Sequence, residues 1–162
     1  MTPEIRLARP AEYDAVGELT VEAYAYDGFL PPGSDYAHTL RAAGDRAAKA
    51  ELWVAVDDDG LLGTVTYCPP GSVYGEIARA DEGEFRMLGV AARARGRGVG
   101  TALTVRCIER TRELGLRAIV MSSATYMTTA HRMYERLGFI RLPDRDWSPI
   151  PGVDLYAFTL EL

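Results

Sequence analysis

The spacing of apolar positions changes along the chain, and each spacing predicts one kind of element. In the first fifty residues apolar side chains recur at helical intervals, which predicts helices over residues 11–25 and about 35–50. Pro31-Pro32-Gly33 lies between them and is typical of a break that ends the first helix. Two short apolar runs then flank an Asp- and Gly-rich turn, which predicts a hairpin of residues 52–56 and 61–67.

The second half of the chain alternates strand and helix patterns after a polar, Gly- and Pro-rich loop. The predicted elements are a loop at 68–83, strands at 84–90, 116–121, 138–142 and 155–162, and helices at 98–114 and 127–137. Gly115 and Gly138, at the two helix ends, suit a left-handed cap. This order predicts right-handed crossovers and neighbouring parallel strands. We therefore expect one domain over residues 1–162, with a mixed sheet flanked by helices, an α/β or α+β fold.

Composition and charge narrow the class of protein. The 162 residues are 48% hydrophobic and 25% charged, as in a globular domain. The sequence has neither a run of about 18 apolar residues nor a basic-then-apolar start, so we expect no membrane partner, no secretory signal and a cytoplasmic location. The formal net charge of −5 disfavours a general nucleic-acid partner. Cys68 and Cys107 form no zinc spacing with either histidine, so free, buried thiols and no metal are expected.

The most informative segment joins a predicted strand to a predicted long helix, and it reads Arg95-Gly96-Arg97-Gly98-Val99-Gly100-Thr101. A helix start exposes N–H groups without intrahelical partners, glycines let an anion approach them, and arginines add charge. This pattern predicts a phosphate site and favours a pyrophosphate. A P-loop would need Gly-Lys, but the single lysine is Lys49, and the third small residue of a dinucleotide fingerprint is missing. The alternative is a turn that merely joins strand and helix.

With further motifs, this segment resembles the GCN5-related N-acetyltransferase (GNAT) superfamily. Arg95-x-x-Gly98-x-Gly100 follows Met87-Leu88-Gly89-Val90, and Ala130-x-x-x-Tyr134-Glu135-x-x-Gly138-Phe139 comes later. The opening Ile5-Arg6-x-Ala8-Arg9-Pro10-Ala11-Glu12 is similar to the family's first strand and helix. The resemblance covers nearly the whole chain. It implies a GNAT-like, mostly antiparallel sheet with one parallel, splayed strand pair.

The resemblance also implies acetyl-CoA (coenzyme A) as the co-substrate. In the family, backbone amides of the loop hold the pyrophosphate, and the preceding strand binds the pantetheine arm where two parallel strands splay. The expected cofactor-binding residues are therefore Leu88, Gly89, Val90, Arg95, Gly96, Arg97, Gly98, Val99, Gly100 and Thr101. Glycine inside a strand independently indicates a bulge or a close backbone approach at Gly89. Many relatives have asparagine seven residues before the tyrosine, where this chain has Met127, which leaves cofactor contacts from this helix open.

Acyl transfer from a thioester to an amine needs a base for the amine and benefits from a proton for the departing thiolate. Glu84 is the candidate base, because relatives often carry a carboxylate at this place in the strand. Arg86 should lie on the same strand face and lower the pKa of Glu84, and a solvated or salt-bridged glutamate is the alternative. The resemblance makes Tyr134 the candidate acid, whereas helical spacing alone predicts a core tyrosine. The amide of Leu88 or Val90 is the expected carbonyl polariser.

The acceptor is expected between loops near 24–37, 68–83 and 143–153, which contain acids and aromatics. The candidate acceptor residues are Tyr24, Tyr26, Asp27 and Glu76, with Asp35, Tyr36, Tyr74 and Trp147 in the same loops. Such a set would suit a cationic, partly apolar amine of a small molecule or peptide. His38 and His131 are interpreted as surface residues without a role.

Three functions are compatible with these features. The first is an acetyl-CoA-dependent N-acyltransferase that acts by direct transfer in a ternary complex. The second is a non-catalytic acyl-CoA-binding or regulatory module of the same fold. The third is an enzyme of nucleotide phosphates, which would bind ATP without competition from CoA. A homodimer is common among relatives of this superfamily.

Overall fold

An eight-stranded mixed sheet forms the centre of the fold in the computed structural model, which describes residues 2–28, 30 and 34–162. The strand order is β1-β2-β3-β4-β5-β8-β6, and β7 pairs with β8. The strands are β1 (Glu4–Leu7), β2 (Glu51–Asp57), β3 (Gly60–Cys68), β4 (Glu82–Val90), β5 (Ala118–Ala124), β6 (Ile140–Arg141), β7 (Trp147–Ile150) and β8 (Val153–Glu161). Within the described part of the chain β4 and β5 form the one parallel pair, so the predicted fold class is confirmed.

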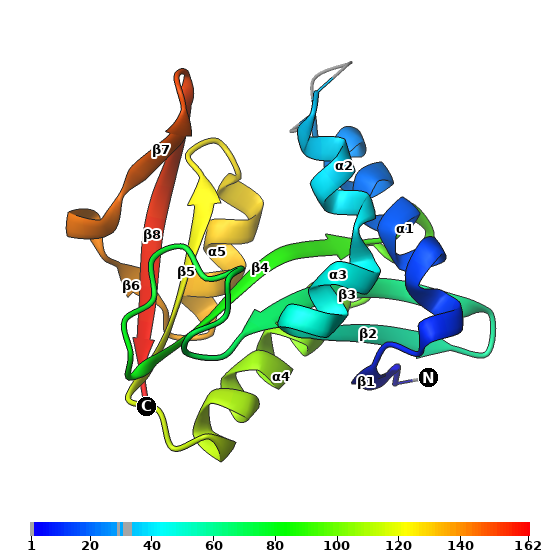
Figure 1. Cartoon of the computed structure of the whole chain (residues 1–162), viewed down its shortest axis with the longest axis horizontal. Coiled ribbons are helices and arrows are strands. Elements are labelled where there is room, and N and C mark those ends of the chain that lie inside the picture. The colour runs from blue at the N-terminus through cyan, green and yellow to red at the C-terminus, as the bar shows by residue number, and fades with distance from the viewer. Residues whose placement is uncertain (1, 29, 31–33) are drawn as a thin grey trace.

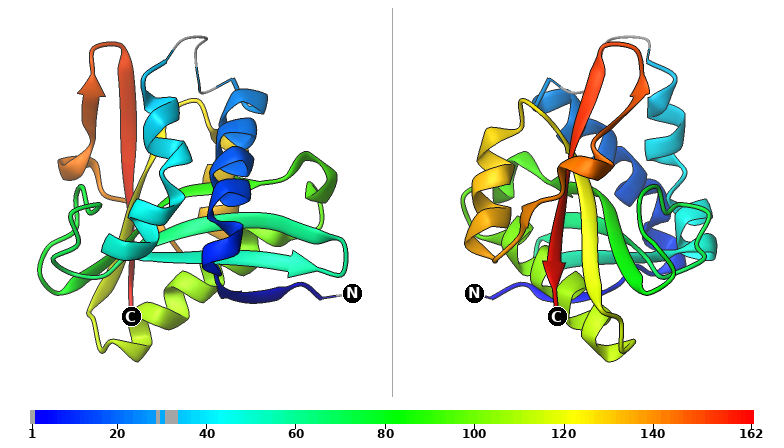
Figure 2. Two further views of the ribbon diagram at one scale, coloured as in Figure 1. Left: turned by 45° about the vertical axis from the view of Figure 1, so that its right-hand side comes forward. Right: turned by 90° about the vertical axis from the view of Figure 1, so that its left-hand side faces the viewer.

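The described residues form five α-helices, which cover the two faces of this sheet (Figure 1). They are α1 (Tyr13–Tyr26), α2 (Tyr36–Arg41), α3 (Ala43–Lys49), α4 (Val99–Glu113) and α5 (Thr128–Arg136). Figure 2 shows α1, α2 and α3 together on one side of the strands and α4 with α5 on the other. No helix among the described residues is long and apolar enough to cross a membrane.

Two apolar clusters, one on each face, hold the helices to the sheet. On one face Leu103 and Ile108 of α4 pack with Val65, Ile119 and Phe158 of the strands. On the other face a smaller cluster forms, and its buried members are Val16, Ala43, Leu52 and Val54. Burial of apolar side chains is the dominant favourable contribution to folding, so this two-sided core fixes the helices around the central strands.

Glycine caps end both helices of the second half, as the sequence predicts. Gly115 has φ +69° and Gly138 has φ +102°, the left-handed region that other residues resist. The N–H of Leu116 donates to the carbonyl of Thr111 at 3.2 Å, and that of Phe139 donates to Tyr134 at 3.0 Å. These are the long hydrogen bonds of Schellman caps, and they turn the chain from α4 into β5 and from α5 towards β6.

Two predictions about the first half and the tail are wrong. Residues 35–50 form two helices, because Ala42 has a non-helical backbone (φ −77°, ψ +52°). The tail at 143–153 contains the strand β7, which the prolines at 149 and 151 obscure in the sequence pattern. Proline is tolerated in β7 because this strand pairs only with β8. The proposed break at residues 31–33 lies outside the described residues.

The expectation of neighbouring parallel strands holds for one crossover and fails for the other. The connection β4-α4-β5 places its two strands side by side and parallel. The connection β5-α5-β6 does not, because β8 lies between β5 and β6 and pairs antiparallel with both. The last strand of the chain therefore inserts into the sheet, a long-range pairing that no local pattern reveals.

A glycine brings α1 and α2 into backbone contact, and its replacement gives a stability prediction. A Cβ at Gly17 would lie 2.5 Å from the carbonyl oxygen of Arg41. We expect Gly17→Ala to cost about 1–3 kcal/mol of unfolding free energy, because a backbone atom cannot move aside as a side chain does. Thermal denaturation measures this loss.

The control for this prediction is Gly44→Ala in α3. A Cβ at Gly44 would approach only a ring carbon of Tyr13, at 3.3 Å, and alanine is the better helix former. This control should be neutral or stabilising. A Gly17→Ala protein with wild-type stability would contradict the close approach of α1 and α2.

Candidate active site at the splay of two parallel strands

The parallel strands β4 and β5 pair over only three residues and then separate. Their register runs from Glu82 opposite Ala118 to Glu84 opposite Val120, whereas β4 continues to Val90. Beyond this point the two strands lead away from each other (Figure 1). We call this divergence the splay. It leaves the second half of β4 without a partner on the β5 side.

A β-bulge in β4 lies at the splay. Thr64 of β3 is opposite Gly89 and Thr66 is opposite Arg86, so Met87 and Leu88 share one position of β3. Met87 has φ +56°, and no other non-glycine residue of the described chain has a positive φ. A bulge leaves backbone groups unpaired and bends its strand. The expected bulge is therefore present, two residues before Gly89.

Gly89 itself allows α1 to pack closely against β4. A Cβ there would lie 3.2 Å from the Cβ of Ala23 in α1 and 3.7 Å from a methyl group of Leu19. The glycine thus lets α1 cross directly over β4. Because α1 ends at Tyr26, this crossing places the end of the helix beside the splay.

The glycine-rich loop presents its backbone to open space. Gly96 (φ +76°) and Gly98 (φ +77°) have no atom within 4 Å of the position of a Cβ. The first backbone hydrogen bond of α4 runs from the N–H of Ala102 to Gly98, so the N–H groups of Val99, Gly100 and Thr101 have no intrahelical partner. The partial positive charge of a helix start adds to them. The start of α4 therefore exposes backbone N–H groups of the kind that can bind an anion.

The arginines of this loop are already paired with acids. Arg97 and Arg93 both approach Asp57 at the end of β2, at 3.3 and 3.6 Å. Arg95 donates to Asp27 at 2.8 Å and lies over the ring of Tyr26 at 4.2 Å. The interactions hold the loop in place, and they offset much of the charge that the sequence suggests for an anion.

Two of the candidate acceptor residues lie beside the expected cofactor loop. Tyr26 and Asp27 lie against Arg95 of the glycine-rich loop. The sequence alone does not reveal this contact, because Asp27 and Arg95 are 68 positions apart. The structure thus brings Tyr26 and Asp27 together with the expected cofactor residues.

Glu84 is fully enclosed, with a relative exposure of 0%. Its Oε1 accepts hydrogen bonds from the N–H groups of Glu76, Ile77 and Ala78, at 2.9, 3.0 and 3.0 Å. Its Oε2 is buried and has no hydrogen-bond partner in the described structure. One oxygen thus anchors the loop before β4, and the other keeps its lone pairs free.

Burial raises the pKa of Glu84 above its ordinary value, and the three N–H groups and Arg86 oppose this shift. Arg86 thus lowers the pKa as expected, but burial has the larger effect and the net direction is upward. Arg86 itself forms an ion pair with Glu76 at 3.2 Å. The alternative of a solvated or salt-bridged Glu84 is wrong, because the carboxylate is enclosed and is bound by backbone groups.

Tyr134 of α5 lies within an aromatic cluster on the other face of the sheet. Its ring centroid is 5.9 Å from those of Phe85 and Phe139 and 6.0 Å from that of Phe158. Its hydroxyl makes no hydrogen bond with the described residues, yet it is not among their fully enclosed, unpartnered polar atoms. Burial raises the pKa of this phenol, so it stays protonated at neutral pH.

The two candidate catalytic residues face the splay from opposite sides. Neighbouring residues of a strand point to opposite faces, and Phe85 points towards Tyr134. Glu84 therefore points to the face covered by α1, α2 and α3. The strands separate directly after Glu84, so the splay connects the two faces at this level.

Aromatic and basic side chains gather on the Glu84 side. The rings of Tyr24 and Tyr36 lie 6.2 Å apart. Arg86 donates to the hydroxyl of Tyr36 at 3.3 Å and to the carbonyl of Tyr74 at 2.9 Å. We call Tyr24, Tyr36, Tyr74, Arg86 and the buried Arg46 of α3 the tyrosine–arginine cluster. The sequence pattern offers no signal for Arg46, because it lies within a predicted amphipathic helix.

His131 is buried, so its interpretation as a surface residue is wrong. Its Nε2 lies 3.2 Å from the hydroxyl of Ser123, and its ring packs 5.1 Å from that of Phe158. Burial lowers the pKa of His131. The histidine is a core residue of α5 that packs against β8.

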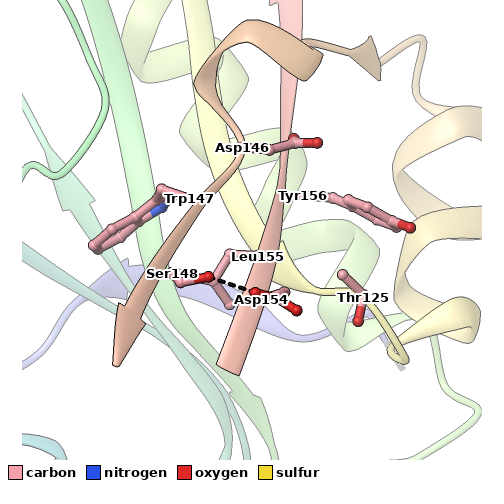
Figure 3. Close-up of a pocket in the computed structure, with 7 residues that line it drawn as sticks. All are labelled: Thr125, Asp146, Trp147, Ser148, Asp154, Leu155 and Tyr156. Carbon is pink, nitrogen blue, oxygen red and sulfur yellow. Dashed lines mark hydrogen bonds between the residues drawn. The ribbon is translucent and has the colours of Figure 1, made fainter. Parts of the chain in front are cut away.

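A surface pocket of about 480 Å³ lies between the β7–β8 hairpin and the end of β5 (Figure 3). Trp147 and Tyr156 point to opposite sides of β8 there. The acids of the pocket are engaged, since Asp146 accepts from Arg141 and from the N–H of Ala157, and Asp154 accepts from Ser148. No group of three or more metal-ligating side chains occurs in the described ranges.

Comparison with known proteins decides the family. The profile described as the Acetyltransferase (GNAT) family matches residues 14–139, which include the splay, the glycine-rich loop and Tyr134. The chain belongs to the GNAT acetyltransferase family. The resemblance inferred from its motifs is thereby confirmed.

Among curated relatives, this GNAT chain is 35% identical over 136 residues to the mycothiol acetyltransferase of Cellulomonas flavigena. The matched region covers 74% of this chain and 39% of that protein. This GNAT chain thus spans about two fifths of the length of that relative.

Solved structures confirm the GNAT fold. A GNAT-family acetyltransferase from Staphylococcus aureus Mu50 superposes with a TM-score of 0.77 at 14% identity and covers 99% of both chains. The yncA protein of Salmonella typhimurium, determined with its cofactor acetyl-CoA, has a TM-score of 0.72 at 19% identity. It covers 100% of this GNAT chain and 95% of its own.

Proposed function

We propose that this protein is an acetyl-CoA-dependent N-acetyltransferase that moves an acetyl group to the amine of a small molecule or peptide. Transfer is direct, within a ternary complex. The observation that carries the proposal is the splay, with the free Oε2 of Glu84 on one side and the hydroxyl of Tyr134 on the other. The two reactants would reach it from opposite faces of the sheet.

The residues of the glycine-rich loop fit the pyrophosphate of acetyl-CoA. The N–H groups of Val99, Gly100 and Thr101 would hold it, because Gly96 and Gly98 leave the approach to the backbone open. Leu88 and Val90 lie on the half of β4 that has no partner strand on the β5 side, where backbone groups can bind the pantetheine arm. The named yncA relative carries acetyl-CoA on the same fold, which supports this choice of cofactor.

Acetyl-CoA, when bound, supplies the acetyl group as an activated thioester. Glu84 takes the proton of the acceptor amine on Oε2, and its raised pKa brings this base closer to neutral pH. Tyr134 donates its hydroxyl proton to the departing thiolate. The amide at the bulge, at Leu88, donates to the developing negative charge on the carbonyl oxygen.

A second candidate function is an acyl-CoA-binding module without turnover. The observation in its favour is that Glu84 anchors a loop through three backbone N–H groups, a structural task. Thiol release from acetyl-CoA across a panel of primary amines separates the two functions. Acceptor-dependent thiol release supports the acetyltransferase, and saturable CoA binding without it would support the module.

The cofactor loop gives a binding prediction of its own. We expect Gly98→Ala to weaken CoA binding about tenfold, or about 1.4 kcal/mol, because its Cβ would occupy part of the open space through which the pyrophosphate reaches the start of α4. Titration calorimetry with CoA measures the change.

Gly115→Ala is the matched control, since Gly115 lies at the opposite end of α4, with φ +69° and the same open surroundings. It carries the same backbone strain and should retain wild-type affinity for CoA. Equal affinities for both variants would contradict the assignment of the loop.

A further inference from the structure

Arg46 of α3 is buried without an anionic partner. Its relative exposure is 0%, and its Nη1 donates to the carbonyls of Thr39 and Leu40 at 2.7 and 2.9 Å. Its Nε and Nη2 are enclosed and have no partner in the described structure. No residue outside the described ranges is an acid, so none of them supplies a carboxylate.

A buried guanidinium without a counter-ion is unfavourable, because arginine stays charged and loses its hydration. The two carbonyls at the end of α2 satisfy only one of its three nitrogens. An anion placed close to Arg46 would therefore be stabilised by the positive charge of its guanidinium.

The acids nearby are all engaged elsewhere. Glu76 pairs with Arg86 at 3.2 Å. Asp45 pairs with Lys49 at 2.9 Å and accepts from the hydroxyl of Tyr74. Glu84 is bound by backbone N–H groups through Oε1. None of these carboxylates forms an ion pair or hydrogen bond with Arg46, and Asp45 acts on it only through longer-range charge attraction.

Arg46 belongs to the cluster that faces the splay. The charges of Arg46 and Arg86 act on the hydroxyl of Tyr24, and so do the neighbouring hydroxyls of Tyr36 and Tyr134. Tyr74 connects the two arginines, because its hydroxyl bonds Asp45, the neighbour of Arg46, and its carbonyl accepts from Arg86. Glu84 and Arg86 are two residues apart on β4 and share one face, so an acceptor with its amine at Glu84 would have the rest of its structure beside Arg86.

We propose that the acceptor is a small amine that also carries a carboxylate, such as a free amino acid, and that the tyrosine–arginine cluster binds this carboxylate. Arg86, whose side chain is 19% exposed, donates to it from the accessible side. Arg46 adds from within a charge that no ion pair with a described residue neutralises. This inference rests on the proposed function, and it replaces the cationic acceptor expected from the loop acids.

The test compares matched acceptors in the wild-type protein. Each of the common amino acids is assayed beside its C-terminal amide, by thiol release from acetyl-CoA and by mass spectrometry of the product. We expect the acids to exceed their amides about 10- to 100-fold in kcat/KM, the effect of one charge-assisted hydrogen bond. Amides that react as well as the acids would overturn the inference and leave the proposed function intact.

Two variants locate the effect. Arg46→Met removes the buried charge at similar volume, and Arg86→Gln removes the accessible one. Each should raise KM for the amino acid about tenfold or more and reduce the preference for acids over amides, while the Kd of CoA stays at its wild-type value. Retention of the wild-type preference in either folded variant would contradict the role of that arginine.

A binding experiment keeps the inference separate from catalysis. Calorimetry on the CoA-loaded protein compares N-acetyl amino acids with their amides. Binding of the acids alone supports the carboxylate site even where no amine releases thiol, a result that would defeat only the proposed function. Equal binding, or binding of neither kind, would overturn the inference.

Discussion

Replacing Glu84 by glutamine is expected to lower kcat about 10²- to 10³-fold, the contribution that a positioned general base makes. The amide oxygen of glutamine can still accept the N–H groups of Glu76, Ile77 and Ala78, so the loop stays anchored. The loss therefore reports on the proton acceptor. Steady-state kinetics at saturating acetyl-CoA measures it.

The pH profile distinguishes a lost base from a disturbed fold. Because burial raises the pKa of Glu84, wild-type activity should fall on the acid side at a pH above the ordinary glutamate value of 4.5. Glu84→Gln should lose this limb and follow the deprotonation of the amine alone. A variant with kcat within threefold of wild type and an unchanged profile would exclude Glu84 as the base.

The same pKa shift fixes the sign of the stability effect. A carboxyl whose folded-state pKa is raised contributes stability below its unfolded pKa and loses it as pH rises through the folded value. Glutamine does not ionise, so Glu84→Gln should be no less stable than wild type at pH 7. A large fall in Tm would show that the carboxylate is needed for the fold.

Replacing Tyr134 by phenylalanine is expected to lower kcat about 10²-fold with little change in stability. The ring contacts with Phe85, Phe139 and Phe158 remain, and the hydroxyl has no hydrogen bond among the described residues to lose. Because burial raises the pKa of Tyr134, the wild-type protein should show no alkaline limb from this phenol near neutral pH. Kinetics and thermal denaturation of the same samples measure both effects.

Tyr13→Phe is the matched control, because Tyr13 lies at the start of α1, where its ring faces Gly44. It removes a phenol hydroxyl outside the candidate site and should leave kcat unchanged. An acyl donor with a poorer leaving thiolate than CoA should suffer most from Tyr134→Phe. A wild-type kcat in Tyr134→Phe would refute its assignment as the proton donor.

Local patterns predicted the elements whose cause is local. Gly115 and Gly138 end their helices as glycine caps do, and the apolar runs on either side of residues 57–60 form the expected hairpin. The break at Ala42 and the strand β7 were missed, because tertiary contacts decide both. Arg46 binds the last carbonyls of α2, and β8 supplies the partner of β7.

The sequence located the candidate site but not its electrostatics. The spacing of Gly98, Gly100 and Tyr134 led to the family, whereas the pairing of Arg95 with Asp27 joins segments 68 residues apart. The raised pKa of Glu84 depends on its burial beneath the loop before β4. Such environments arise only when the chain is folded. Residue types alone therefore predicted a lowered pKa for Glu84, whereas in the folded protein it is raised.

The central claim is that the splay between β4 and β5, with the glycine-rich loop beside it, binds acetyl-CoA. A crystal structure of the protein with CoA tests it most directly. We expect the pyrophosphate on the N–H groups of Val99, Gly100 and Thr101, and the sulfur within hydrogen-bonding reach of Tyr134 at the end of the β4–β5 pairing. CoA bound at any other place, with these N–H groups facing solvent, would contradict it.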